Sequence, residues 1–403
     1  MKIANRKSQI ANFSVPGFKA AGISCGVKKN GNKDLALIYS AVPAVAAGVF
    51  TKNKVKAAPV LLDMGRMKKG FCQAVIINSG NANACTGKKG MEDAARMVIA
   101  VEDALGIKKG LAMVSSTGVI GQNLQIDKIE KGIPKLVASL SSKGWNDAAH
   151  AIMTSDAFPK FAFEKCRIGG KEISVLGIAK GAGMICPDMA TMLAFLATDA
   201  AIEQKTLQAM LKKAVDNSFN SITVDGDTST NDTALILANG KAGNKQFTIH
   251  SSQFTLFCEM LERVCLQLAK MIVMDGEGAT KLLEFNVIGA KTDSDAKKVA
   301  ESVANSPLVK TAFFGEDANW GRIIAAIGRS GAYMKEEKVN IYFNGVPVVL
   351  KGLDAGREKD AAKTVKNENI CIRIEMGLGK GKKTVWASDL SYKYVKINAA
   401  YRT

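Results

Sequence analysis

The hydrophobic positions in the first half of the 403-residue chain follow two different periods. The run 73–78 (QAVIIN) is short, continuous and rich in β-branched residues, which predicts a buried strand. The run 91–105 places apolar residues at helical spacing and predicts a helix, whose apolar positions are Ala95, Val98, Ile99 and Val101. Between them, the segment 78–87 (NSGNANACTG) is rich in Gly and Asn and predicts a tight polar turn. The first half therefore alternates strands with helices.

The middle of the chain predicts a strand followed by two helices. Residues 181–188 (GAGMICPD) interrupt regular structure, and 192–199 form the strand candidate that follows. Two helical faces come next, the second longer than the first. They comprise Leu207, Met210, Leu211 and Val215, and then Phe257, Met260, Leu261, Val264, Leu268 and Met271.

The last quarter of the chain predicts strands. Residues 339–343 and 346–350 flank Asn344-Gly345, which is a strong signal for a two-residue hairpin turn. Residues 370–376 and 384–388 are expected to flank a Gly/Lys loop in the same way. No internal repeat is visible. The pattern as a whole predicts a mixed α/β protein with several sheets.

The length and composition indicate a globular protein with more than one core. At 403 residues, two or three lobes are expected. Apolar residues make up 47% and charged residues 23%, a balance typical of soluble proteins. The longest apolar runs, such as 41–50, are far shorter than a membrane span. The start, MKIANRKSQIANF, has neither a secretory nor a transit pattern. We therefore expect a cytoplasmic protein with no membrane partner.

The cysteines and histidines do not indicate a metal site. The eight cysteines are spread singly, without a CxxC pair, and only two histidines accompany them. In a chain of this length they are interpreted as reduced, mostly buried thiols. We expect no metal and no bound cofactor.

The formal net charge of +18 allows two interpretations. Lys and Arg could contact the phosphates of a nucleic acid. The cations are, however, scattered as singles and pairs, and no aromatic residues interleave them as a base-stacking surface would require. We therefore expect no nucleic-acid partner and interpret the charge as a solvated surface, whose field can attract anionic substrates.

The scarcity of histidine narrows the catalytic chemistry. His150 and His250 lie in polar stretches, and no Gly-x-Ser-x-Gly elbow occurs, so a histidine-assisted nucleophile is disfavoured. A threonine at a chain's N-terminus needs no histidine, because its own α-amine, with a reference pKa of about 8, takes the proton of its hydroxyl. The segment 180–193 (KGAGMICPDMATML) has small residues and a proline before a strand. These features fit such a cleavage site, but taken alone they favour an ordinary loop by a wide margin, since many Gly-rich loops precede strands.

A family resemblance over the whole chain decides between these interpretations. The segment KGAGMICPDMATMLAFLATDA resembles the self-cleavage segment of the ornithine acetyltransferase/glutamate N-acetyltransferase family. Further segments resemble other blocks of that family in the same order: VPGFKAAGISCGVKKNGNKDLALIYS, AAGVFTKNKVKAAPV, NSGNANACTG, SSTGVIG, MTSDAFPK, DGDTSTND, MDGEGATK, FGEDANWGRI and YVKINAAYRT. Together they run from Val15 to Thr403.

The resemblance implies a catalytic role for four residues. The chain would cut itself between Ala190 and Thr191, and the freed Thr191 would be the nucleophile. Its hydroxyl would take the acetyl group of N2-acetylornithine and pass it to glutamate, as a step of arginine biosynthesis. Thr117 and Gly118 match the oxyanion hole of the family.

The resemblance also implies a set of substrate-binding residues. They are Thr154, Lys180, Thr191, Glu277, Asn398 and Thr403. The Lys180 cation suits the substrate carboxylate, and Glu277 suits the side-chain ammonium of ornithine. Asn398 and Thr403 lie at the end of the chain, so their inclusion implies that the C-terminus folds back to the site.

The implied fold is an αββα layered sandwich of the N-terminal-nucleophile type. Residues 1–190 and 191–403 would become an α and a β chain that share one folded unit, and two of each would form a heterotetramer. The resemblance leaves open whether acetyl-CoA also donates acetyl groups to glutamate, and we expect that it does. The alternative functions are a related self-processing aminopeptidase or amidohydrolase and, from another class, a basic nucleic-acid-binding protein.

Overall fold

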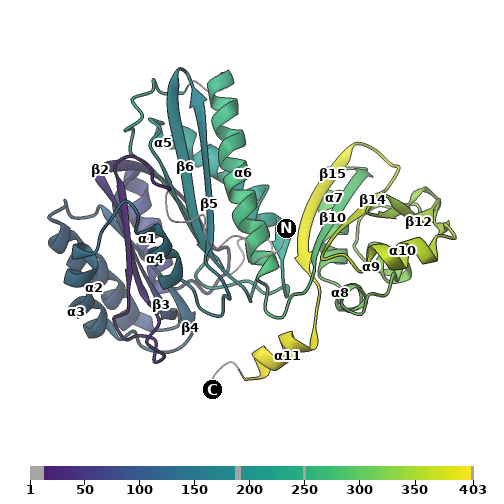
Figure 1. The fold of residues 1–403 in the computed structure, drawn as a ribbon, viewed down its shortest axis with the longest axis horizontal. Coiled ribbons are helices and arrows are strands. Elements are labelled where there is room, and N and C mark those ends of the chain that lie inside the picture. The colour runs from purple at the N-terminus through teal and green to yellow at the C-terminus, as the bar shows by residue number, and fades with distance from the viewer. Residues whose placement is uncertain (1–12, 187–191, 248–250, 401–403) are drawn as a thin grey trace. The chain divides into compact units, whose positions relative to one another are not determined.

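The computed structural model describes residues 13–186, 192–247 and 251–400. The chain forms two compact units. The first comprises Met1–Gly181, Asp188–Asn220 and Thr228–Ala269, and the second comprises Ala182–Pro187, Ser221–Asp227 and Lys270–Thr403. Figure 1 shows the helices and strands of both units.

The first unit contains an eight-stranded sheet whose order is β4-β3-β2-β9-β7-β6-β5, with β1 also paired to β2. The strands are β1 (Phe18–Ile23), β2 (Leu35–Phe50), β3 (Phe71–Asn81), β4 (Ala112–Val119), β5 (Lys160–Ile168), β6 (Lys171–Lys180), β7 (Leu193–Thr198) and β9 (Thr233–Ala238). The long strand β2 has an irregular register between Tyr39 and Ala44. Its beginning pairs with β1 and β3, and its end pairs with β9, so β2 passes from one half of the sheet to the other.

The two halves of this sheet pack face to face between two helical layers. Alternate residues of β2 and β3, such as Leu37 and Ile76, share a core with the outer helices α2 (Gly87–Leu105) and α3 (Ile126–Ala138). The residues between them, such as Ile38 and Ile77, share a core with β6, β7 and β9 of the other half. The sandwich αββα that the resemblance implies is therefore confirmed on this side by the burial pattern.

The fourth layer lies on the outer face of β6 and β7. At Gly177 of β6, an added Cβ would meet Leu268 and Val264 of the long helix α6 (Ser252–Met274) at 2.8 and 3.3 Å. The helix and the strands lie side by side in Figure 1. The shorter helices of this unit are α1 (Ala58–Arg66), α4 (Trp145–Ala151) and α5 (Gln204–Asp216).

The predicted elements of the first unit are confirmed, with shifted ends. The strand predicted at 73–78 is the longer β3, and the helix predicted at 91–105 begins at Gly87 as α2. The strand predicted at 192–199 is β7, and the two helical faces belong to α5 and α6.

Strands from before and after the predicted cleavage site interleave in the first unit. β7 and β9 follow residue 191 in the sequence, yet they lie between β2 and β6, which precede it. A cut between residues 190 and 191 would therefore leave both pieces hydrogen-bonded in one sheet. The predicted boundary itself falls in residues 187–191, outside the described residues.

The second unit is a seven-stranded sheet of order β13-β12-β11-β14-β10-β15-β8. The strands are β8 (Ile222–Thr223), β10 (Leu282–Ala290), β11 (Asn340–Phe343), β12 (Val346–Leu350), β13 (Leu353–Asp354), β14 (Asn369–Glu375) and β15 (Gly381–Ser388). One face bears buried residues such as Phe285 and Ile372, which form a core with the helices. These helices are α7 (Asp293–Ala304), α8 (Pro307–Phe314), α9 (Trp320–Gly328) and α10 (Glu358–Thr364), whereas the C-terminal α11 (Tyr392–Ala399) contributes no buried residue to this core.

One predicted hairpin is confirmed and the other is wrong. β11 and β12 pair across Asn344 and Gly345, whose φ angles of 45° and 89° are those of a type I′ turn. β14 and β15 do not pair with each other, because β10 lies between them and bonds to both. Gly-rich loops occur in both connections, so a loop's composition alone does not reveal a strand inserted from elsewhere.

Two other expectations from composition can be compared with the structure. The cysteines are thiols rather than disulfides, but only Cys72, Cys258 and Cys265 are buried, so the expectation of mostly buried thiols is wrong. Within the part of the chain that the structure describes, no helix is both long and apolar enough to cross a membrane.

Candidate active site

Three of the predicted site residues meet in the first unit, where strands end. Thr117 and Gly118 lie near the end of β4, and Lys180 is the last residue of β6. Thr154 lies in the loop between α4 and β5. The Lys180 Nζ lies 3.2 Å from the Thr117 Oγ1 and 2.7 Å from the Thr154 Oγ1. Thr117 and Thr154 are 37 residues apart in the sequence, and Thr154 and Lys180 are 26 apart. The fold of the first unit brings the three side chains into one polar cluster.

The direction of these hydrogen bonds matters for chemistry. An ammonium can only donate, so both hydroxyl oxygens accept from Lys180. The Thr154 hydroxyl in turn donates a hydrogen bond to the Asp156 Oδ2 at 3.4 Å. Within the described residues, the Thr117 hydroxyl has no such acceptor, so its hydrogen can donate to a ligand. This is the polarity that an oxyanion-hole donor needs.

Asp156 is the anionic centre of the cluster and was assigned no role from the sequence. Its carboxylate accepts the N–H groups of Thr154 at 2.8 Å and Gly181 at 2.7 Å, and it lies 2.7 Å from the Lys160 Nζ. Burial by itself would raise the pKa of Asp156, but the charges of Lys160 and Lys180 outweigh it and hold this pKa well below the usual range. At neutral pH an ionised Asp156 thus fixes the loop that carries Thr154.

The backbone at Gly118 approaches its neighbour too closely for any side chain. Its φ is +137°, and an added Cβ would lie 2.3 Å from the carbonyl carbon of Gly80 at the end of β3. Glycine is therefore required here by sterics. The predicted oxyanion residue Gly118 stands where two parallel strands end in contact.

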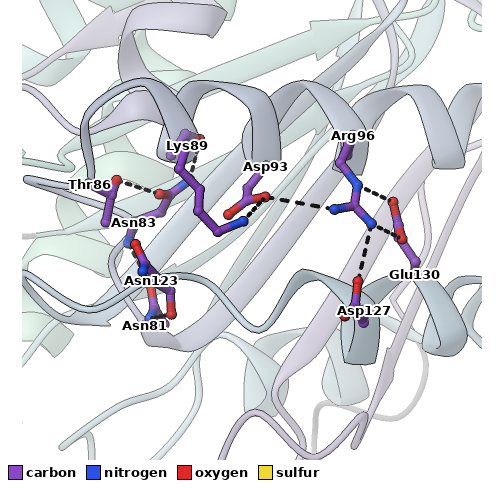
Figure 2. Close-up of polar contacts among 10 residues, drawn as sticks. Asn81, Asn83, Thr86, Lys89, Asp93, Arg96, Asn123, Asp127 and Glu130 are labelled. Carbon is purple, nitrogen blue, oxygen red and sulfur yellow. Dashed lines mark hydrogen bonds and ion pairs between the residues drawn. The ribbon is translucent and has the colours of Figure 1, made fainter.

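The loop after β3 is anchored to the helix that follows it. The Asn81 side chain donates to the Asn123 carbonyl at 3.1 Å, and the Asn83 side chain donates to the Gly90 carbonyl of α2 at 2.9 Å (Figure 2). The Thr86 hydroxyl donates to the Asn83 side chain at 2.7 Å. The predicted tight turn at 78–87 is only partly confirmed, since residues 78–81 extend β3 and the turn runs over 82–86, where Asn83 and Thr86 hold it to α2.

A second buried carboxyl lies beside the strand that follows the predicted nucleophile. The Asp232 Oδ1 accepts the N–H of Met192 at 3.1 Å, and the side chain is 1% exposed. Within the described residues, the Asp232 Oδ2 has no hydrogen-bond partner. Burial raises the pKa of the Asp232 carboxyl well above its usual range, against the opposing effect of the Met192 N–H.

Two further predicted residues meet in the second unit. Glu277 follows α6 in a loop, and its Oε2 accepts from the Asn398 side chain of α11 at 2.9 Å. The Glu277 N–H donates to the Ala182 carbonyl at 2.8 Å, and an added Cβ on Gly183 would lie 2.6 Å from the Glu277 carboxyl carbon. The chain's last helix therefore reaches a carboxylate next to the segment that leads to the predicted cleavage site.

The remaining predicted residues are Ala190, Thr191 and Thr403, which lie outside the described residues. The sequence predicts no role for Asp156, Lys160 or Asp232, although Asp156 and Lys160 lie in the family-like segment MTSDAFPK and Asp232 lies in DGDTSTND. One feature of the sequence could have indicated a role for Asp156 and Asp232. Each is a charged residue shortly before a predominantly apolar strand, where side chains often face a site at the strand ends.

Comparison with known proteins supplies the family. The model of the ArgJ family matches residues 19–403. The arginine biosynthesis bifunctional protein ArgJ of Geobacter sulfurreducens is 52% identical over 393 residues, which cover 97% of this chain and 100% of that protein. The protein of the same name from Syntrophotalea carbinolica is 53% identical over 391 residues, which cover 96% of this chain and 99% of that protein.

Among solved structures, the crystal structure of the arginine biosynthesis bifunctional protein from Bacillus halodurans is 42% identical. The match covers 50% of this chain and 96% of that one, with a TM-score of 0.49. The identification rests on the sequence matches, which extend over nearly the whole length of both partners. The chain belongs to the ArgJ family.

Proposed function

We propose that the protein is the acetyltransferase of arginine biosynthesis that moves an acetyl group from N2-acetylornithine to glutamate, yielding ornithine and N-acetylglutamate. Membership of the ArgJ family supports the reaction class. The observation that carries the assignment is the donor geometry around Lys180. This buried ammonium donates to two threonine hydroxyls and leaves that of Thr117 able to donate to a developing oxyanion.

The proposed reaction begins with self-cleavage of the Ala190–Thr191 bond. The new α-amine of Thr191 takes the proton of the Thr191 hydroxyl as the oxygen attacks the acetyl carbonyl carbon. The oxyanion of the tetrahedral intermediate is stabilised by the Thr117 hydroxyl and the Gly118 N–H. The C–N bond to ornithine then breaks, the departing nitrogen takes the proton, and an acetyl ester remains on Thr191.

The second half of the reaction reverses these steps with another amine. The α-amino group of glutamate attacks the ester carbonyl, the Thr191 oxygen leaves, and the proton lost by the amine returns to Thr191. In this scheme Lys180 and Thr154 bind the substrate carboxylate, and Glu277 binds the side-chain ammonium of ornithine. Asn398 holds the Glu277 carboxylate, and Thr403 completes the binding set.

Several finer points belong to the same proposal. Acetyl-CoA serves as a second acetyl donor to glutamate, and no cofactor stays bound. Two α chains (1–190) and two β chains (191–403) form a heterotetramer in the cytoplasm. The interleaving of β7 and β9 between β2 and β6 supports a stable α–β pair, because cleavage would break no sheet hydrogen bond between these strands.

The alternative is a self-processing aminopeptidase or amidohydrolase, which would transfer the acyl group to water. The family match over residues 19–403 favours the transferase. Kinetics separate the two, because in a ping-pong transferase glutamate must accelerate the release of ornithine from N2-acetylornithine. Ornithine release at a rate independent of glutamate would establish the hydrolase.

The cleavage step is tested by the intact mass of the denatured protein. Wild type is expected to give two pieces, 1–190 and 191–403, and a Thr191→Ala variant is expected to remain whole and inactive. An uncut wild-type chain that still transfers acetyl groups would overturn the N-terminal-threonine mechanism.

A further inference from the structure

Two consecutive residues that immediately precede β9 reach towards two different strand ends. The Asn231 side-chain amide donates to the Ser116 carbonyl at 2.8 Å and to the Ala82 carbonyl at 2.6 Å. The Ser116 carbonyl belongs to the peptide group whose nitrogen is that of Thr117. Asn231 therefore holds the peptide directly before the predicted oxyanion-hole residues, and it is only 6% exposed.

Asp232 makes the corresponding contact to the other strand. The N–H that its Oδ1 accepts, at 3.1 Å, belongs to Met192 and so to the peptide group directly after Thr191. The neighbouring Thr233 N–H donates to the Met192 carbonyl at 3.2 Å. Met192 is thus held through both its N–H and its carbonyl by the start of β9.

The pair is itself held rigidly. The Thr230 hydroxyl donates to the Asn231 Oδ1 at 2.6 Å, and the Asn231 N–H donates to the Ser229 hydroxyl at 3.1 Å. The Asp232 carbonyl accepts the Thr51 N–H of the segment after β2 at 2.9 Å. Every contact lies within the first unit, and each group is buried or nearly so.

We propose that Asn231 and Asp232 are positioning residues, which set the distance between the nucleophile Thr191 and the oxyanion-hole residues Thr117 and Gly118. The inference rests on the proposed function, since it presupposes that these residues act together. The two residues are consecutive in the chain. Asn231 hydrogen-bonds the peptide group before Thr117, and Asp232 hydrogen-bonds the peptide group after Thr191. A shift of either residue is therefore transmitted to the separation of the reacting groups.

A purely structural role would have a different consequence. Buried hydrogen bonds to backbone groups stabilise a fold wherever they occur. Positioning acts on the rate of the chemical step, because a misplacement of about 1 Å can cost about 100-fold in rate. Substrate binding, which involves other residues, should change much less. The split between kcat and KM thus distinguishes the two roles.

The test compares Asn231→Ala and Asp232→Ala with two controls in the same unit. Asp199, which directly follows β7, is 2% exposed and accepts the Ser174 N–H at 2.8 Å, much as Asp232 accepts that of Met192. The Asn244 side chain, beyond the far end of β9, donates to the Ala201 and Lys245 carbonyls. The controls are Asp199→Ala and Asn244→Ala. Self-cleavage, Tm, kcat and KM for N2-acetylornithine are measured for each protein.

We expect Asn231→Ala and Asp232→Ala to lower kcat by roughly 10- to 100-fold and to slow self-cleavage, with KM changed by less than about threefold. The controls are expected to lower Tm but to keep kcat within about twofold of wild type, since their bonds lie away from the reacting groups. Asp232→Asn, which retains an acceptor for the Met192 N–H, is expected to recover most of the lost kcat.

The outcomes that contradict the inference are distinct from failure of the proposed function. Folded Asn231→Ala and Asp232→Ala variants with wild-type kcat would overturn the inference alone, as would an equal loss of kcat in the controls. If either alanine variant does not fold, Asn231→Leu and Asp232→Leu provide the same comparison, since leucine keeps the side-chain size but can neither donate to the Ser116 carbonyl nor accept the Met192 N–H. A wild-type protein that neither cleaves itself nor transfers acetyl groups would overturn the proposed function and this inference with it.

Discussion

The Lys180 ammonium donates a hydrogen bond to the Thr154 hydroxyl at 2.7 Å, and both residues come from loops and strand ends that are 26 residues apart in the sequence. Lys180 is 3% exposed, so its charge has little water around it. A buried cation that is solvated by hydroxyl groups is well suited to bind an anion, because the anion gains a strong charge-assisted bond.

Replacing Lys180 with methionine is therefore expected to weaken substrate binding. A charge-assisted hydrogen bond contributes about 1.5–3 kcal/mol, so KM for N2-acetylornithine should rise roughly 10- to 100-fold. Steady-state kinetics of ornithine release measure the change. Lys310→Met is the matched control, since Lys310 is also buried, at 4% exposed, but lies in the second unit. An unchanged KM in Lys180→Met would contradict the assigned role.

Gly183 allows a test of Glu277 that leaves the carboxylate itself in place. An added Cβ at Gly183 would lie 2.6 Å from the Glu277 carboxyl carbon, so Gly183→Ala must displace that side chain. We expect KM for N2-acetylornithine to rise at least severalfold, with a smaller effect on glutamate, which lacks the ornithine ammonium. Gly328→Ala is the control, because among the described residues nothing outside its own helix backbone and chain neighbours lies within 4 Å of an added Cβ. Equal KM values in both variants would argue against a role for Glu277 in binding.

Much of the first unit could be predicted from the sequence, because burial imposes a readable period. The spacing of apolar residues such as Leu207 and Val264 predicts the buried faces of α5 and α6. Continuous apolar runs predict β3 and β7. The topology was less accessible. The placement of β10 between β14 and β15 depends on packing between segments about 90 residues apart, and no local pattern records it.

The candidate site shows the same division. Thr117, Lys180 and Glu277 came from family motifs, and the structure adds which of them touch. Asp156 could not be assigned from the sequence, since an Asp near a strand is usually a solvated charge or a turn residue. Its importance follows from burial beside Lys160 and from two accepted N–H groups, and both arise only in the folded chain.

The buried pair of Asp156 and Lys160 makes a prediction for stability. Both side chains are 0% exposed, and removing one partner of such a pair typically costs about 3–5 kcal/mol, because the remaining charge stays buried. Asp156→Asn should therefore lower the urea midpoint markedly. The double variant Asp156→Asn/Lys160→Met is expected to recover part of this loss, since it removes the stranded ammonium.

The pH dependence of that loss has a definite sign. The pKa of Asp156 is lower in the folded than in the unfolded protein, so its contribution is fully present above the unfolded value of about 4. As the pH falls below about 4 towards the folded pKa, the contribution is lost. Urea midpoints of wild type and Asp156→Asn should thus converge in acid. A difference that stays constant from pH 7 to pH 3 would show that the carboxylate charge does not stabilise the fold.

Lys310 of α8 makes a prediction on the alkaline side, where stability again rises with pH, this time because burial penalises the charged form of the side chain. Its ammonium donates to the Ser388 carbonyl and lies 3.3 Å from the Ser388 Oγ. Burial lowers the pKa of Lys310 to about 8, although the charges of Asp389 and Asp225 act to raise it. The unfolded chain, with an ordinary lysine pKa of about 10.4, then binds more protons than the folded one between these two values.

Stability of the second unit should therefore rise with pH from about 8 to about 10.4, by up to about 3 kcal/mol, and Lys310→Met should lack this rise. Urea unfolding in a Trp145→Phe background measures it, since two of the three tryptophans, Trp320 and Trp386, then remain and both lie in the second unit. The charged lysine costs free energy below pH 8, so the advantage of Lys310→Met over wild type should be largest there. Parallel pH profiles for the two proteins would mean that Lys310 stays fully charged in the fold and that the Asp389 and Asp225 charges offset its burial.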